Sequence, residues 1–363
     1  MNQYLKTYKI TLTTIGPVFI GSGRTISKKE YVILKNNEVG ILDIEKLYQQ
    51  LKKKNLDTEF ENYLLGNTRP NMSFWLRQQN LTNEEMKQCT NYTVSYAEKG
   101  KQNFEIKEFI KDAYQMPYIP GSSLKGMLRT ILLSSDILQN KEKYQSKGKS
   151  LKSDVFNSTR EVTLDRNIKE IETLRYNTLK RNEKQITNSV NDIMSGFIVS
   201  DSEPLQISDL VLCRKVEQHA SGKVTPFILL RECIKPETKI TFNLTIDTSI
   251  CNITMEEIQN AVALFSKQYY ENFVKAFPNT KPLEKDNVLL GGGVGFVSKT
   301  ILYPMLGKED GLKVTQSLFL KKRSCKKHKH EDDRKLGVSP HILKCTKYKG
   351  KMLQMGLCKF EIQ

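Results

Sequence analysis

Alternation of apolar and polar residues predicts the strands of this chain. From Tyr8, apolar side chains alternate with Lys and Thr until Gly16-Pro17, which is typical of a half-buried strand. The same kind of pattern predicts further strands at 31–34, 39–42, 196–202, 209–216, 226–231, 239–246 and 351–363. Turn-forming residues, Asn36-Asn37 and Ser221-Gly222, separate two of the neighbouring pairs, so two hairpins are predicted, the second of them long and basic.

A repeat of three to four residues between apolar side chains predicts helices at 43–51, 124–133 and 255–277. Asp43 is a suitable N-cap for the first helix. Thr254 and Glu257 have the spacing of a capping box at the start of the third, and a proline follows its end.

Each half of the chain therefore combines strands with a long helix, which predicts a duplicated α+β architecture of split βαβ units. We expect one unit over residues 1–225 and the other over 226–363. Residues 43–115 read as a helical elaboration of the first unit. Residues 141–190 are rich in Lys and Asn and are predicted to be a mobile surface insertion.

Charge narrows the choice of partner. The 363 residues carry a formal net charge of +17. Residues 321–351 contribute a net +9 and residues 141–190 a net +5, in both cases without the period of a membrane-surface helix. A nucleic acid is therefore the favoured polyanion over a lipid surface, and solubility alone is the remaining alternative.

Several classes of protein are excluded by the composition. No apolar run is long enough for a transmembrane span, and the first residues do not form a secretory signal. The seven cysteines are scattered and contain no C-x-x-C pair, so neither a disulfide framework nor a zinc site is indicated. We expect a cytoplasmic protein in a reducing compartment, with no membrane partner.

A glycine-serine turn opens the second predicted helix. Gly121-Ser122-Ser123 would leave backbone N–H groups at the positive end of the helix dipole, where phosphate groups bind, and either serine could cap the helix. Lys125 and Arg129 are four residues apart and share one helix face. The alternative is an ordinary capped helix with solvated basic side chains.

Two other glycine-rich runs lie beside cations. They are Gly21-Ser22-Gly23-Arg24, and Gly291-Gly292-Gly293-Val294-Gly295 with Lys299 after it. Glycine lets the backbone approach a phosphate or another backbone closely, so tight turns are the alternative interpretation. Taken together, the three runs predict a track for a sugar–phosphate chain.

Catalytic and metal-binding groups are not evident. His328 and His330 precede three acidic residues, but they lie among lysines, and alternate residues of a loop rarely converge on an ion. His219 is a candidate general base for a ribonuclease, although no partner for it is evident. We therefore assign no catalytic residue, no metal site and no cofactor.

The motifs also carry a family resemblance. Ile119-Pro120-Gly121-Ser122-Ser123-Leu124-Lys125-Gly126 resembles the signature of the RAMP superfamily of CRISPR-associated RNA-binding proteins. The segments that also fit are Val199-Ser200-Asp201-Ser202, Leu230-Arg231-Glu232, the Gly291–Gly295 run and the following Gly295–Thr300 segment. Length and motif order are most similar to a subunit of the type III-A (Csm) effector complexes, over nearly the whole chain except 141–190.

The resemblance implies two RRM-like, ferredoxin-type domains that bind the CRISPR RNA (crRNA) near its 3′ end and support its maturation in antiviral defence. It implies crRNA, target RNA, other RAMP and small subunits of a Csm ribonucleoprotein, and host nucleases as partners. The RNA-binding residues expected from the motifs and the loops are Gly21, Ser22, Gly23, Arg24, Gly121, Ser122, Ser123, Lys125, Arg129, Arg231, Gly291, Gly292, Gly293, Gly295 and Lys299.

The resemblance also bears on catalysis. RAMP subunits that cut target RNA carry an aspartate a few residues before the glycine-serine turn. Residues 105–110 offer none, and Asp112 fits the non-catalytic acid nearer the turn. We expect a protein that is not an enzyme. The alternatives are a ribonuclease that trims the crRNA, using His219 or Glu105, Glu108 and Asp112, and a purely protein-bridging scaffold.

Overall fold

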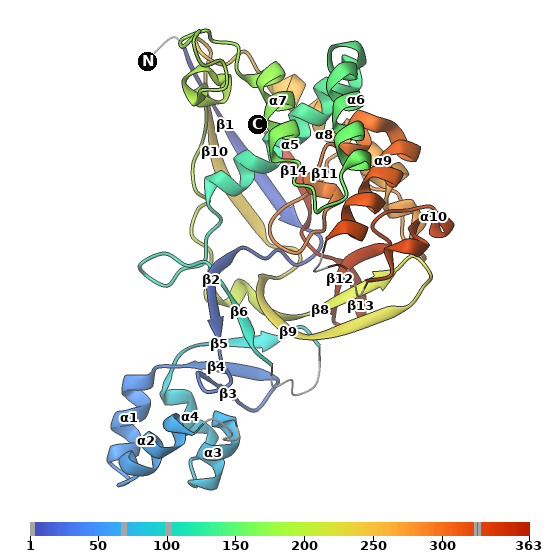
Figure 1. The fold of residues 1–363 in the computed structure, drawn as a ribbon. Helices are drawn as coiled ribbons and strands as arrows, with labels where there is room; N and C mark the ends of the chain where they lie inside the picture. The colour runs from blue at the N-terminus through green and yellow to red at the C-terminus, as the bar shows by residue number, and fades with distance from the viewer. Residues whose placement is uncertain (1–3, 67–70, 99–103, 323–324, 326–327) are drawn as a thin grey trace.

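The computed structural model describes residues 4–66, 71–98, 104–322, 325 and 328–363. The strands are β1 (Leu5–Thr14), β2 (Gly21–Ile26), β3 (Tyr31–Ile33), β4 (Glu38–Leu42), β5 (Thr90–Tyr96), β6 (Ile106–Phe109), β7 (Phe197–Val199), β8 (Leu210–His219), β9 (Val224–Ile234), β10 (Lys239–Asp247), β11 (Asn287–Leu289), β12 (Ile342–Tyr348), β13 (Lys351–Gln354) and β14 (Leu357–Ile362). The α-helices are α1 (Ile44–Lys52), α2 (Asp57–Leu65), α3 (Met72–Gln78), α4 (Asn83–Gln88), α5 (Gly121–Gln139), α6 (Lys141–Asn157), α7 (Asp165–Tyr176), α8 (Met255–Asn272), α9 (Leu302–Lys321) and α10 (Asp333–Leu336). The protein is a mixed α+β structure (Figure 1).

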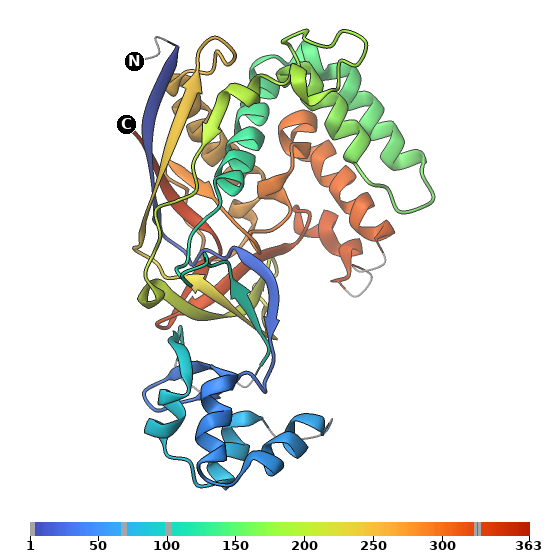
Figure 2. The same ribbon diagram turned by 90° about the vertical axis from the view of Figure 1, so that its left-hand side faces the viewer.

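The first sheet has the strand order β11-β14-β1-β10-β7, and all of its pairs are antiparallel. The predicted alternation in β1 is confirmed, because Ile10 pairs with Phe242 and Leu12 with Ile240, and all four side chains are buried. Helices α5 and α8 contribute their apolar stripes to the same core and cover one face of this sheet (Figure 2).

The second sheet has the order β2-β6-β9-β8-β5-β4-β3, and β12 and β13 extend it from β8. Both predicted hairpins are present. Asn36 and Asn37 have positive φ between β3 and β4, and Gly222, with φ +90°, lies in the turn between β8 and β9. Two pairs, β5–β8 and β6–β9, are parallel.

The predicted elaboration at 43–115 is helical only as far as α4. Helices α1 to α4 share a second hydrophobic core with residues of β3 and β4, and in it Tyr63 stacks on Trp75 with ring centroids 4.7 Å apart. The helices lie beside β4 and the edge strand β3, at the bottom of Figure 1. Asp43 caps α1 as expected, through its side chain and the amide of Lys46. The range also contains β5 and β6, which the sequence interpretation missed.

The prediction of a mobile insertion at 141–190 is wrong. Helices α6 and α7 occupy most of this range, and α6 packs against α9. Its buried side chains, Tyr144, Leu151 and Val155, recur at helical spacing within a highly charged sequence. This helix was missed in the sequence because its buried face contributes only about one apolar side chain per helical turn. Helix α9 itself was also not predicted.

The basic segment 321–351 also contains regular structure. It contains α10 and β12, and the buried residues His330, Asp333 and His341 lie within it. The predicted tail strand is two strands, β13 and β14, separated at Gly356.

Helix α8 begins as predicted at Thr254, whose side chain accepts a hydrogen bond from the amide of Glu257. The predicted capping box is not completed, and the Glu257 carboxylate pairs with Arg175 of α7. No helix in the described part of the chain is long and apolar enough to cross a membrane.

The strand pairing does not separate the chain at the expected boundary between 225 and 226. That position lies inside β9, and the first sheet joins β1 and β7 to β10, β11 and β14. The two ends of the chain therefore meet in one sheet.

Candidate nucleic-acid interface

The glycine-rich run after β11 folds against the segment between β1 and β2. The amide of Gly292 donates a hydrogen bond to the carbonyl of Phe19, with N and O 2.6 Å apart. Gly291 has φ +95°, and a Cβ there would lie 2.4 Å from the same carbonyl oxygen. These two glycines are therefore required for close backbone packing, as the tight-turn interpretation expects.

The ring of Phe19 brings several expected site residues together. A Cβ on Gly21 or on Gly292 would lie 3.0 Å from this ring, and the Arg231 guanidinium lies 5.4 Å from its centroid. Gly293, with φ +78°, is adjacent to Arg231, because a Cβ there would lie 2.7 Å from Nη1. Phe19, the Gly21–Arg24 run, the Gly291–Gly295 run and Arg231 of β9 thus form one surface, which we call the Phe19 surface.

Sequence reasoning missed Phe19. It is half-buried and lies between the Gly16-Pro17 bend and Gly21, the first residue of β2. The signal in the sequence was a single aromatic residue flanked by these glycines. An aromatic ring held beside an arginine can serve as a stacking surface for a base.

The cations on and near this surface differ in how far they are neutralised. Among the described residues, neither Arg231 nor the exposed Lys299 forms an ion pair. Lys344, whose Cγ lies 3.6 Å from the position of a Cβ on Gly295, is paired with Glu217. Arg231 and Lys299 therefore keep a charge that a phosphate can neutralise.

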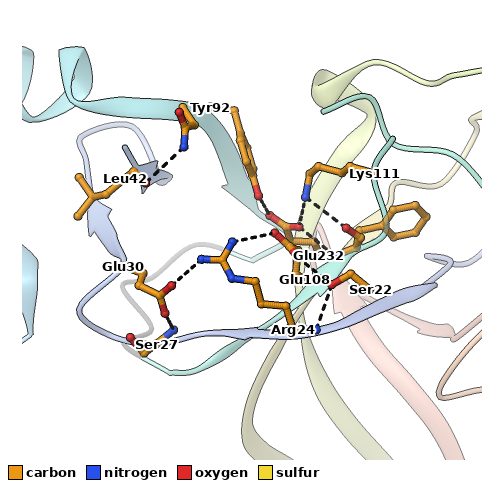
Figure 3. A network of polar contacts seen from close by, with 11 residues as sticks. Ser22, Arg24, Ser27, Glu30, Leu42, Tyr92, Glu108, Lys111 and Glu232 are labelled. Atoms are coloured by element: carbon orange, nitrogen blue, oxygen red, sulfur yellow. Dashed lines mark hydrogen bonds and ion pairs between the residues drawn. The ribbon is translucent and has the colours of Figure 1, made fainter. Parts of the chain in front are cut away.

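Gly21 to Arg24 belong to strand β2 rather than to a free loop, and their polar groups are engaged (Figure 3). The Ser22 hydroxyl donates to the Glu108 carboxylate at 2.8 Å. Arg24 pairs with Glu30 and, at 3.5 Å, with Glu108. Two carboxylates thus compete with any phosphate for Arg24, whose side chain remains about half exposed.

A buried ion pair lies next to this network. The Lys111 ammonium and the Glu232 carboxylate are 2.7 Å apart, with exposed fractions of 4% and 0%. The Tyr92 hydroxyl and the Phe109 amide also donate to Glu232 (Figure 3). Burial, followed by the proximity of Glu232, raises the pKa of Tyr92. The ion pair joins the segment after β6 to β9. Because Glu232 is the next residue after Arg231, the pair also fixes the part of β9 that carries Arg231.

The Gly121 turn does not belong to the Phe19 surface. It packs against residues 199–202. The Gly121 amide donates to the Asp201 carboxylate at 2.8 Å, and a Cβ at 121 would lie 2.4 Å from the carbonyl oxygens of Val199 and Ser200. Helix α5 begins at Gly121 with Pro120 as its N-cap, so neither serine caps it as predicted. The positive end of the helix already receives a carboxylate of this chain.

Lys125 and Arg129 do share one helix face, but that face is covered. Lys125 donates from Nζ to the Met194 carbonyl at 2.8 Å, and burial lowers its pKa. Arg129 pairs with Asp192 at 2.8 Å and with Glu172 at 3.1 Å. These contacts hold α5 to α7 and to the segment before β7. A phosphate-binding role for the two residues stays a prediction.

The residues considered for ribonuclease activity have structural contacts. Asp112 accepts hydrogen bonds from the amides of Tyr114 and Met116, both at 2.8 Å, and so closes a turn. Glu108 binds Ser22 and Arg24. Within the described residues, Glu105, Glu108 and Asp112 belong to no cluster with metal-binding geometry.

Comparison with known proteins identifies the class. The family model of the RAMP superfamily matches residues 11–296. A CRISPR system Cms protein Csm5 from Mycobacterium tuberculosis (strain CDC 1551 / Oshkosh) is 30% identical, over 100% of this chain and 99% of its own length. A Csm5 from Streptococcus thermophilus is 30% identical over 83% of this chain and 81% of its own. The chain therefore belongs to the RAMP superfamily and, within it, to the Csm5 proteins.

Solved structures share the fold. A chain in the cryo-EM structure of a Csm-crRNA-target RNA ternary complex of a type III-A CRISPR-Cas system aligns with TM-score 0.64 and 19% identity, over 98% of this chain and all of that one. The crystal structure of T. onnurineus Csm5 aligns with TM-score 0.61 and 18% identity, over 96% and 99%.

Proposed function

We propose that this protein is a non-catalytic, crRNA-binding subunit of a type III-A Csm effector complex. Membership of the Csm5 proteins supports a place in such a complex, and the ternary complex that shares its fold contains crRNA and target RNA. The other partners are the RAMP and small subunits of the complex, with host nucleases carrying out the maturation of the crRNA. The site of action is the cytoplasm.

The Phe19 surface carries the proposal. It combines a glycine-rich backbone, which a sugar–phosphate chain can approach closely, with an aromatic ring and with Arg231, which has no ion-pair partner among the described residues. Lys299, also without one, follows the glycine-rich run in sequence. Phosphate contacts supply affinity without reading sequence, which suits a guide whose sequence varies. We assign Gly293, Gly295, Arg231 and Lys299 to the 3′ part of the crRNA.

The connectivity supports a ferredoxin-type unit. Strands β14, β1, β10 and β7 are neighbours in that order, with α5 between β1 and β7 along the chain and α8 following β10. This is a β-α-β-β-α-β arrangement. We propose that the first sheet, with α5 and α8, is one of the two RRM-like units and that the second sheet belongs to the other unit.

The experiment that tests RNA binding compares two double variants. Arg231→Ala with Lys299→Ala removes the two unpaired cations, whereas Lys275→Ala with Lys313→Ala removes two that are paired with Glu271 and Glu309. Filter binding with labelled crRNA over a range of salt concentrations is the readout. We expect the first variant to bind at least tenfold more weakly, with a salt slope smaller by about 1–2, since each phosphate contact contributes roughly one. Equal affinities and slopes for both variants would contradict the site.

Catalysis is tested on the same preparation. Labelled RNA is incubated with the purified protein with and without Mg²⁺ or Mn²⁺, and we expect no shortening. The absence of cleavage is expected because Glu108 and Asp112 are engaged in structural hydrogen bonds. Shortening that is lost in Asp112→Asn or His219→Ala would establish the ribonuclease instead.

A further inference from the structure

The four histidines of the chain form one row in the fold. His219 of β8 and His341, just before β12, have ring centroids 5.5 Å apart. His341 and His330 follow at 5.2 Å, and His330 and His328 at 6.1 Å. Residues separated by more than a hundred positions are thus brought together, which the spacing of His328 and His330 alone could not indicate.

A buried carboxylate lies between two of these rings. Asp333 is fully buried, and each of its oxygens faces a different imidazole. Oδ2 lies 3.1 Å from Nδ1 of His330, and Oδ1 is in contact with Nδ1 of His341. One ligand atom from each of the three residues lies within 4.8 Å of the other two. The sequence run His328 to Asp333 supplies two of the three groups, and His341 supplies the third.

The surrounding residues hold these groups in place. The Ser339 hydroxyl donates to Asp333 at 2.5 Å, and Gln316 donates to the carbonyl of His330 at 2.7 Å. Phe319 stacks on the His330 ring with centroids 4.7 Å apart. Such outer contacts orient ligands and are a regular feature of protein metal sites.

Carboxylates offset part of the positive charge near the cluster. Among the described residues, Lys215 and Lys344 lie near His328 and share one carboxylate partner, Glu217, whose side chain is only 2% exposed. That carboxylate offsets one of their two positive charges, and Lys223 lies near His219. Asp333 adds a negative charge that an incoming ion would neutralise.

We propose that His330, Asp333 and His341 bind one divalent transition-metal ion of the zinc class. Two imidazole nitrogens and one carboxylate oxygen are a donor set that Zn²⁺ accepts, and His219 or His328 lies beside the cluster to complete a tetrahedron. Both imidazoles bind as neutral ligands. The ion would fasten α10 to the start of β12 and to α9.

The site also supports the Phe19 surface indirectly. Phe319, which stacks on His330, makes an edge contact with Phe296 at 5.2 Å, and Phe296 follows Gly295 directly. Metal binding would therefore stiffen the end of the glycine-rich loop. The metal site itself does not depend on the RNA-binding proposal.

The test uses the full-length protein after removal of metal with a chelator. Zn²⁺ alone is titrated in by calorimetry, with the bound metal counted by mass spectrometry and the melting temperature followed. We expect one ion per chain and a melting temperature that rises with the Zn²⁺ concentration. Asp333→Asn should weaken binding at least tenfold, while Asp332→Asn, the same change at an exposed neighbour, should bind as the wild type does.

Cobalt provides a second measurement that does not depend on the variants. Co²⁺ in a tetrahedral site gives visible d–d absorption, which we expect for the folded wild type and which an excess of Zn²⁺ should remove. Less than a tenth of an ion per chain, no such absorption, or equal effects of Asp333→Asn and Asp332→Asn would overturn the site and leave a buried hydrogen-bond cluster.

Discussion

The Gly121 amide at the first turn of α5 donates a hydrogen bond to the carboxylate of Asp201, which immediately precedes Ser202 in the segment after β7. The anion at this helix N-terminus is thus supplied by the chain itself. In this protein the Gly121-Ser122-Ser123 turn of the family signature therefore connects the start of α5 to the segment after β7. Arg231, which has no ion-pair partner among the described residues, lies instead beside Phe19, at the Gly291–Gly295 run.

Gly121→Ala should destabilise the fold. A Cβ would lie 2.4 Å from two backbone carbonyl oxygens, and backbone cannot move aside as a side chain does. We expect a loss of about 1–3 kcal/mol in the free energy of unfolding, measured with urea.

Gly126→Ala is the matched control on the same helix. It is exposed, with no neighbouring atom within 4 Å of the new Cβ, and should stabilise α5 by about 0.5–1 kcal/mol. Equal effects of the two substitutions would show that the Gly121 contact is not tight in solution.

Arg129→Ala should reduce stability and leave RNA affinity within twofold. The substitution removes the ion pairs of Arg129 with two carboxylates and its contact with the Tyr176 ring, whose centroid is 4.1 Å from the guanidinium carbon. Together these interactions contribute about 1–2 kcal/mol to the free energy of unfolding. Arg166→Ala, which removes a side chain that is 90% exposed, should change stability by less than about 0.5 kcal/mol. Urea unfolding and filter binding measure the two effects, and a tenfold loss of RNA affinity in Arg129→Ala would return this residue to the RNA site.

Lys111→Met should be strongly destabilising, by about 3–5 kcal/mol, because it leaves the Glu232 carboxylate buried without a counter-charge. The double variant Lys111→Met with Glu232→Gln removes both charges and should recover part of that loss. One hydrogen bond stays unmade, because Tyr92 and Phe109 donate to different oxygens of Glu232 and the new amide has only one oxygen. Thermal and urea unfolding of the three proteins give the comparison. A double variant as unstable as the single one would contradict a charge-based cause.

The buried thiols should be inert. Burial raises the pKa of Cys345 and of Cys358 to about 12, so roughly one thiol in ten thousand is ionised at pH 8. A thiol-specific chromogenic reagent should react first with the partly exposed Cys325. Cys325→Ser should remove that fast phase, and fast labelling of Cys345 would refute the expected burial.

The same shifts give a pH dependence. A thiol whose folded pKa is raised stabilises the fold below its unfolded pKa of about 8.5, and this contribution is lost as the pH rises toward 12. We expect the free energy of unfolding to fall between pH 8 and pH 10.5, and to fall less in Cys345→Ala with Cys358→Ala. Identical pH profiles for the wild type and the double variant would show that these two thiols do not cause the pH dependence.

Local pattern was sufficient where neighbours in sequence are neighbours in space. The alternation of β1, the Asn36-Asn37 hairpin, the capping of α1 by Asp43 and most of α8 all depend on residues within a turn or two of one another. The family signature at 119–126 is also a local string. For these features the sequence alone was enough to predict the element and, through the resemblance, the class of protein.

Long-range contacts determined the rest. Whether a cation is available depends on which carboxylates surround it, so Arg129 and Arg231 could not be distinguished before Asp192 and Glu172 were placed beside the first. The pairing of β1 with β10 and the meeting of His219, His330 and His341 join distant parts of the chain. Composition records how many charges a chain has, but only packing decides which of them remain without a partner.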